Sequence, residues 1–458
     1  MTKRLDIRRD EGFALVLVML LIAILTILGI TLMELVRSES TRSAKAVTSG
    51  TSYQAAEAGI DDYIAKLVDD RLYFDHYVHD GESTRTATSG TTTGAGQKWT
   101  GGGGWQYLNG KDTWTENTLG NGYEYNLQVF APTASVPYIK IVSTGRKKGS
   151  TTDQRSIEAL VRPSSIADFV MMANSDVSYG STATTKGKVY AGIDSSGVKH
   201  NVYHPGTAYA DIYAEGNVTG SPTLIGDAGK YDQTTIRTKI KQPIDFNNFV
   251  VALVDVESAS DPALGGIKLD DATKDAWEIL FVNDGTVRYR WCKKNGSNDV
   301  AYDKPTNCGS WTTKPVPSNG AIYSAQTAIV SGEVNGRVTV ASNNHIVVGE
   351  ETKYYQEGDD VLGLIAKNDV IVAQWAPSVF NWRAAVLAQT GRRHSYSSDG
   401  SHAKAVFKGS TATNLSPYMD MFVEREYIYD EQLLYLQPPW FPTIEGAYTV
   451  VLFREVTP

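Results

Sequence analysis

The sequence has very little cysteine: Cys292 and Cys308 are the only two in 458 residues. A zinc or iron–sulfur site built from four thiolates is therefore excluded. An excess of basic residues is missing as well, because 43 Lys and Arg face 51 Asp and Glu, a net charge of −8. We therefore expect no nucleic-acid partner. The motifs of a serine nucleophile elbow, a zinc-binding His-Glu-x-x-His helix and a Walker phosphate loop are also absent. These absences favour a protein that is not an enzyme and needs no cofactor.

Charge is missing altogether from the 21 residues between Phe13 and Met33. A helix that crosses the hydrocarbon core of a bilayer needs about 20 apolar residues, so this run can span a membrane. Lys3, Arg4, Arg8 and Arg9 precede it, which predicts a single pass through the inner membrane with the rest of the chain outside the cytoplasm. A cleaved secretory signal is the competing interpretation, but its apolar region is shorter, about 7–15 residues.

Two motifs around this run resemble those of a known family. The basic leader ends in Gly12 and is followed by the aromatic Phe13, and a Gln-Ala-Ala-Glu-Ala-Gly segment follows further along. The combination resembles the class III leader and early helix of type IV minor pilins of the PilX type. The resemblance implies that prepilin peptidase cuts between Gly12 and Phe13 and that the new N-terminus is methylated. For the second motif we expect a packing role, since its small residues permit close approach; it comprises Gln54, Ala55, Ala56, Glu57, Ala58 and Gly59.

Leu17 departs from the pattern of the major pilins. In that family the fifth residue of the mature chain is a glutamate that pairs with the N-terminal amine of a neighbouring subunit. Counted from Phe13, the fifth residue here is Leu17, so this contact cannot form. A buried charge is costly unless it is paired, and a subunit without the carboxylate is therefore expected to be a minor component. The K-type pseudopilin of type II secretion resembles the chain in the same absence.

The pattern of apolar residues predicts an α+β fold. We expect a long N-terminal pilin helix carrying a small antiparallel sheet, followed by a large, mostly β domain of short repeated runs, a β-solenoid, with a sandwich as the alternative. The predicted parts are a leader (1–12), a transmembrane and assembly helix (13–36), a helix extension with its sheet (37–162) and a display domain (163–458) that contains an insertion (227–320).

The residues with ligand chemistry predict a disulfide and no metal site. Cys292 and Cys308 flank a polar loop on the exported side, which favours a bridge between them. Two histidine pairs, His76 with His79 and His200 with His204, lack an evident third ligand. Four oxygen-bearing residues resemble a calcium loop without its Gly and final Glu; they are Asn295, Ser297, Asp299 and Asp303. The 25 tyrosines and 9 tryptophans provide material for a glycan- or surface-binding face.

The predicted function is that of a minor pilin or pseudopilin subunit, located at the tip of a type IV pilus, which acts in filament assembly and in surface contact or adhesion. Its expected partners are prepilin peptidase, other minor and major pilins, the inner membrane and a surface or tip adhesin. One alternative is a K-type pseudopilin of type II secretion. Another, of a different class, is a membrane-tethered β-solenoid enzyme acting on polysaccharide, which needs acids and bases clustered on one face.

Overall fold

The computed structural model describes residues 47–69, 73, 114–116, 122–130, 138–225, 249–434 and 436–457. They fall into two compact units: Pro163–Thr449, and the residues up to Arg162 together with Val450–Pro458. The last strand of the chain therefore belongs with the first unit, and the large unit is inserted between two strands of the small one. The sequence interpretation placed everything from residue 163 onward in one display domain.

The expected fold class is wrong. The described part of the chain is mostly β, and the long N-terminal pilin helix is not seen. One longer helix covers residues 47–69, and the remaining helices are short. The reason lies in the large unit, where short runs of β-branched residues between Gly, Ser and Asn turns favour strands throughout. Residues 1–46, with the leader and the uncharged run, lie outside the described residues. No described helix is long and apolar enough to cross a membrane.

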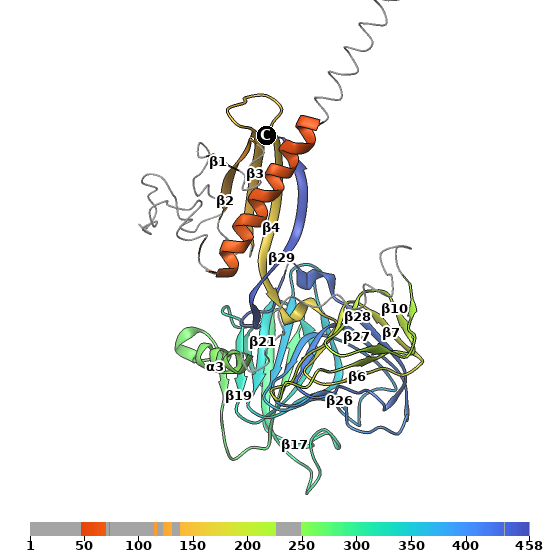
Figure 1. The fold of residues 1–458 in the computed structure, drawn as a ribbon. Helices are drawn as coiled ribbons and strands as arrows, with labels where there is room; N and C mark the ends of the chain where they lie inside the picture. Colours follow the sequence, from red (N-terminus) through yellow and green to blue (C-terminus); the bar gives the residue numbers. More distant parts are fainter. Residues whose placement is uncertain are drawn as a thin grey trace, which may run out of the picture. The chain divides into compact units, whose positions relative to one another are not determined.

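The small unit is a helix packed on an antiparallel sheet (Figure 1). Neighbouring strands from β1 to β4 are antiparallel, and β29 lies next to β4 at the edge. Buried and half-buried residues alternate along β3, as expected for a strand with one covered face. The strands are β1 (Thr115–Glu116), β2 (Tyr123–Phe130), β3 (Ile139–Lys147), β4 (Arg155–Ser165) and β29 (Thr443–Val456).

Small residues bring the helix unusually close to this sheet. A Cβ added to Gly145 of β3 would lie 2.0 Å from the carbonyl oxygen of Ser52 and 2.6 Å from the backbone nitrogen of Ala56. A Cβ on Gly59 would lie 2.7 Å from the ring of Tyr125. Glycine is therefore favoured on both surfaces, because an added Cβ would overlap the helix backbone at Gly145 and the Tyr125 ring at Gly59.

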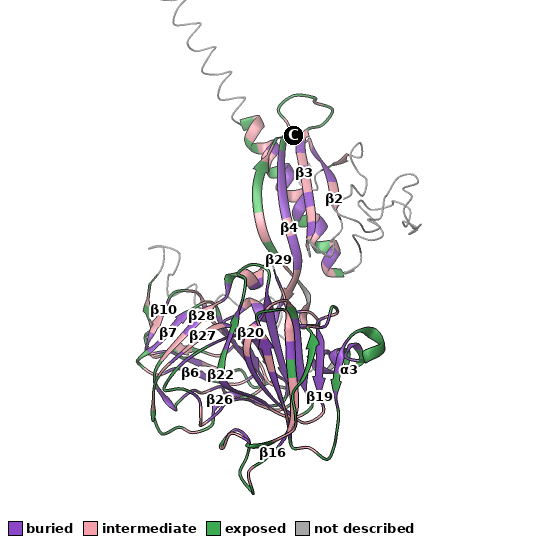
Figure 2. Ribbon diagram, turned by 180° about the vertical axis from the view of Figure 1, so that it is seen from behind, coloured by how far each residue is buried: buried purple, intermediate pink, exposed green. Residues whose placement is uncertain are grey.

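The large unit is a stack of coils whose equivalent strands pair in parallel. Val340 pairs with Leu364 and Leu364 pairs with Val386, so one buried aliphatic column runs along the stack. Each coil takes roughly 20 residues and contributes strands to three faces, as in a β-solenoid. In Figure 2 its strands are largely purple, which marks buried residues. The expectation of a large β domain is confirmed.

The strands of the stack are mostly short, as the spacing of apolar runs predicts, although β25 and β27 run for 10 and 12 residues. They are β5 (Met171–Ala173), β6 (Val177–Ser178), β7 (Ala183–Lys186), β8 (Val189–Ala191), β9 (Val202–Tyr203), β10 (Thr207–Ala208), β11 (Ile212–Ala214), β12 (Val218–Thr219), β13 (Thr223–Leu224), β14 (Ile267–Leu269), β15 (Ala276–Val282), β19 (Ala321–Ser324), β20 (Thr327–Val334), β21 (Arg337–Ser342), β22 (Ile346–Tyr354), β23 (Val361–Ala366), β24 (Val370–Val372), β25 (Val379–Ala388), β26 (Arg393–Ser395), β27 (His402–Thr413) and β28 (Phe422–Tyr429).

The order of the coils in space differs from their order in the chain. The coil that begins with β5 stacks on the last coil, because β5 pairs with β27 and β7 pairs with β28. The stack continues from there through β8 and β11. At the other end it begins with β14 and β15, which pair with β19 and β20. Parts of residues 227–320 thus belong to the stack, although the sequence interpretation separated them as an insertion.

The remainder of that region decorates the first coils. Helix α3 (Val250–Ala259) contacts β19 and β21. Strand β16 (Thr286–Lys293) forms an antiparallel hairpin with β15 through Asn283-Asp284-Gly285, the turn that Asp-Gly predicts. Two further strands extend the hairpin, β17 (Asn307–Cys308) and β18 (Thr312–Pro315).

Candidate functional site

The large unit contains a cavity of about 800 Å³. It lies where the coil from β5 to β7 meets the next two turns of the chain and the end of β28. Its lining residues come from positions between Ser164 and Thr449, so distant parts of the sequence converge on it.

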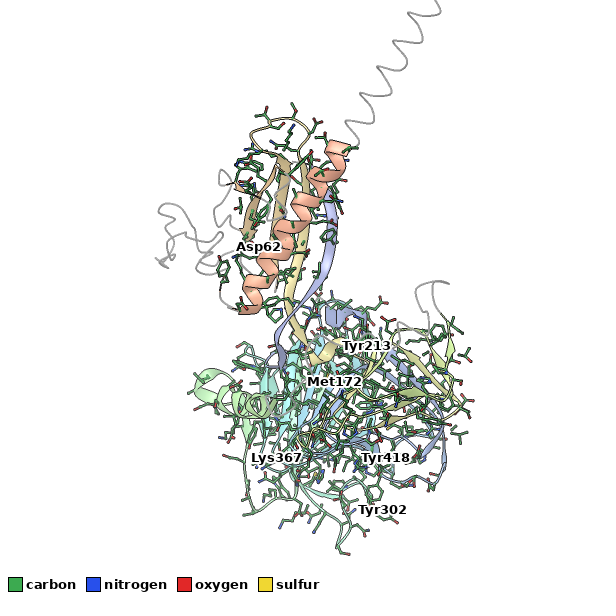
Figure 3. The ribbon with its side chains drawn as sticks, in the orientation of Figure 1. Asp62, Met172, Tyr213, Tyr302, Lys367 and Tyr418 are labelled. Atoms are coloured by element: carbon green, nitrogen blue, oxygen red, sulfur yellow. A yellow bond between two sulfur atoms is a disulfide. The ribbon has the colours of Figure 1, made fainter. Side chains whose placement is uncertain are left out.

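Aromatic rings form much of the wall of this cavity. Phe169 packs edge-on against Tyr213, with ring centroids 6.5 Å apart, and Tyr213, labelled in Figure 3, comes from β11. Tyr209 is 39% exposed, and the Lys186 ammonium lies 5.8 Å from its ring centroid. Because ring faces stack against the apolar faces of sugars and other flat ligands, this wall suits binding more than acid–base chemistry.

Charged groups at the rim are divided between internal contacts and free ones. The Lys186 ammonium is 2.5 Å from a carboxylate oxygen of Glu426, and this hydrogen bond is the main cause of a raised lysine pKa. Asp168 accepts hydrogen bonds from the Ser165 backbone and the Thr449 hydroxyl. Among the described residues the exposed Lys188 ammonium has no hydrogen-bond or ion-pair partner. The exposed Glu431 carboxylate also lines the cavity, so charged groups of both signs lie beside the aromatic faces.

A glycine allows the cavity wall to close. A Cβ on Gly187 would lie 2.5 Å from the Cβ of Tyr429 and 2.8 Å from that of Val170. No larger residue can stand between β7 and β8 without moving Tyr429. The sequence interpretation did not single out this cavity, because its lining residues are spread from Ser164 to Thr449 and form no local motif.

The residues predicted from the family resemblance divide into two groups. Gly12, Phe13 and Leu17 lie outside the described residues. The segment from Gln54 to Gly59 lies on the helix of the small unit, where Ala55 and Ala56 are fully buried and Gln54 is exposed. The buried side of this segment lies close to Gly145 of β3.

Cys292 and Cys308 form the predicted disulfide. They face one another directly in the antiparallel pairing of β16 with β17. Within the described residues, the one group of three potential metal ligands consists of these two cysteines and Glu278. Both sulfurs are used in the bridge, so this group is not a thiolate metal site.

We expect the Cys292→Ser variant to lower the free energy of unfolding by about 3 kcal/mol, because a bridge over a loop of this length restricts the unfolded chain. Urea unfolding of oxidised protein measures it. Cys308→Ser and the double variant should give the same loss, since each removes the same bond, and none should change processing of the N-terminus. Two free thiols in peptide maps of the exported wild-type protein would contradict the prediction.

The described histidine and calcium-loop candidates hydrogen-bond to other groups of the protein. His200 lies between Asp176 and Asp194, 3.3 Å from each, whereas His204 is fully buried and contacts the Thr185 hydroxyl. The side-chain Oδ1 of Asn295 accepts hydrogen bonds from the backbone nitrogen and the hydroxyl of Thr306, so this oxygen stabilises its own loop. His76 and His79 lie outside the described residues.

No protein-family model matches the chain, and no curated protein matches it either. Among solved structures, the chain is similar to one described as the crystal structure of the competence-associated pilin ComZ from Thermus thermophilus. The two share 13% sequence identity with a TM-score of 0.30, over 89% of this chain and 97% of that chain. A TM-score of 0.30 does not establish a shared fold.

Proposed function

We propose that the protein is a minor pilin-like subunit that is anchored in the inner membrane, incorporated into a type IV filament and specialised for display of its solenoid. The observation that carries the proposal is the insertion of the large unit between β4 and β29 of the small one. Both ends of the solenoid thus return to the unit that follows the uncharged run. Cleavage after Gly12 would release the mature subunit for incorporation into the filament. The proposed role is non-catalytic.

Surface contact is assigned to the tyrosine-lined cavity. The free Lys188 ammonium and the exposed ring of Tyr209 together suit a saccharide that carries an acidic group. The partners of the helix end are prepilin peptidase and neighbouring pilins, and the partner of the solenoid is a surface glycan or a tip adhesin.

Leu17 supports a position at the tip. An interior subunit without a carboxylate at this place leaves a neighbour's amine unpaired in an apolar setting, which costs several kcal/mol. A subunit at the tip has no subunit above it that needs this partner. Immunogold labelling of sheared filaments should therefore mark ends, and Leu17→Glu should not improve incorporation. Dense labelling along whole shafts would contradict the tip position.

Processing is the direct test of the proposed function. We expect the membrane-extracted protein to begin at Phe13, which changes the net charge from −8 to −9 because the leader carries four bases and three acids. Gly12→Val should abolish this cut, since the leaders that this N-terminus resembles end in glycine. Gly29→Ala, within the uncharged run, serves as the control and should be processed normally.

N-terminal sequencing and intact mass measure the outcome. A mature end near residue 35 would identify an ordinary secretory signal and would overturn the pilin-like assignment.

A further inference from the structure

The first residue of β26 is an arginine in a place where other coils carry aliphatic residues. Ile346 pairs with Val370, and Val370 pairs with Arg393 along one face of the solenoid. Ile346 and Val370 are fully buried, and Arg393 is only 1% exposed. The guanidinium therefore lies in the interior of the stack.

Three aromatic rings from another face surround this guanidinium. Its central carbon lies 4.8 Å from the ring centroid of Phe407, 5.0 Å from that of Tyr427 and 5.9 Å from that of Trp382. The three rings are neighbours in the register, because Trp382 pairs with Phe407 and Phe407 pairs with Tyr427. The ring faces attract the positive charge, and the Tyr427 hydroxyl also accepts a hydrogen bond from the guanidinium, but this neutral acceptor adds no counter-charge.

The charge has no counter-charge among the described residues. No ion pair of Arg393 is found there, and its Nε and Nη1 hydrogens have no acceptor. Arg383, by comparison, is 7% exposed and bonds both Asp430 and Glu357. A fully buried cation with unfilled donors is strongly unfavourable, so the site requires a negatively charged acceptor.

The groups beside Arg393 add a further donor and no second charge. The Tyr179 hydroxyl is buried without a partner and lies within electrostatic range of the guanidinium. Its ring lies tilted against that of His204, with centroids 4.5 Å apart, and burial lowers the pKa of His204 to about 4. His204 is therefore neutral near pH 7.

We propose that the interior of the solenoid binds a small monovalent anion, chloride under cellular conditions, at the unfilled Nε–H donor of Arg393. A water molecule would fill the hydrogen bonds but leave the charge uncompensated. The site lies beside the junction where the coil from β5 to β7 stacks on β27 and β28, because Tyr427 of β28 and Tyr179, which follows β6, both lie near the guanidinium. Its occupant thereby stabilises the closure of the stack.

Thermal unfolding of the purified full-length chain tests the site, with chloride exchanged for gluconate at constant ionic strength. We expect Tm to rise steadily with each tenfold increase in chloride, as for a ligand that binds only the folded state, and gluconate to have no such effect. Arg393→Met should abolish the dependence, and Tyr179→Phe, which keeps the cation, should weaken it. Arg337→Met, an exposed arginine on β21, should leave it unchanged.

Crystals grown in bromide give a second readout. An anomalous peak within hydrogen-bond distance of Arg393 in the wild type, absent in Arg393→Met, is the expected result. The proposal is overturned if no peak appears there, or if Arg393→Met keeps the chloride dependence of the wild type.

Discussion

Replacing Arg383 with methionine should lower the free energy of unfolding of the solenoid by about 3–5 kcal/mol, the usual cost of removing one partner from a buried ion pair. Nε and Nη2 of Arg383 donate to the two carboxylate oxygens of Asp430 at 2.7 and 2.8 Å. Asp430 is only 1% exposed. Without the arginine its negative charge stays buried and unpaired, so the folded state loses more than the bonds themselves.

A second carboxylate makes this arginine a bridge. Glu357 accepts from Nη1 and Nη2, and these hydrogen bonds are the main reason that the pKa of Glu357 is lowered. Because Glu357 is well exposed, losing its ion pair with Arg383 costs much less free energy than leaving the buried Asp430 carboxylate unpaired.

Urea unfolding of wild-type and variant chains measures the effect. Lys408→Met is the matched control, since Lys408 lies 3.8 Å from Glu357 on the surface and should cost less than about 1 kcal/mol. Arg383→Met combined with Asp430→Asn should recover part of the loss by removing the buried charge. An Arg383→Met variant within about 1 kcal/mol of the wild type would show that the pair does not stabilise the fold.

The Gly145→Ala variant should destabilise the small unit by about 3 kcal/mol, at the upper end of the usual cost of overpacking. The new Cβ would meet the backbone of Ser52 and Ala56, and backbone atoms inside a helix cannot move aside. The helix must then rise from the sheet, which opens the contacts of Ala55, Ile60 and Leu67.

Hydrogen exchange measures this loss where it occurs. Residues 47–69 and 139–147 should exchange faster in the variant, whereas β19 to β25 of the solenoid should not change. Gly50→Ala is the control, because nothing lies within 4 Å of the new Cβ and alanine favours a helix. Equal hydrogen-exchange rates in the wild type and Gly145→Ala would mean that the close contact between the helix and β3 does not stabilise the small unit.

Local patterns in the sequence were sufficient for several elements. Alternation of apolar and polar residues identified β2, β3 and β4, and Asp284-Gly285 identified the hairpin of β15 and β16. Each of these signals acts between residues that are close in the chain, where side-chain direction and turn geometry are set by the residues themselves. The disulfide was also predictable from local sequence, because Cys292 and Cys308 are separated by a short loop.

The sequence by itself was thus sufficient to identify the uncharged N-terminal run and to predict the small sheet, the high β content of the large unit and its disulfide. Only the tertiary structure decided the overall fold class, the order of the coils, the return of Val450–Pro458 to the small unit, and the cavity. The physical reason is that parallel strands from different coils pair equally well in many orders by local rules. The choice depends on long-range packing, in which Arg383 meets Asp430 and Arg393 meets Tyr427 across distant turns of the chain.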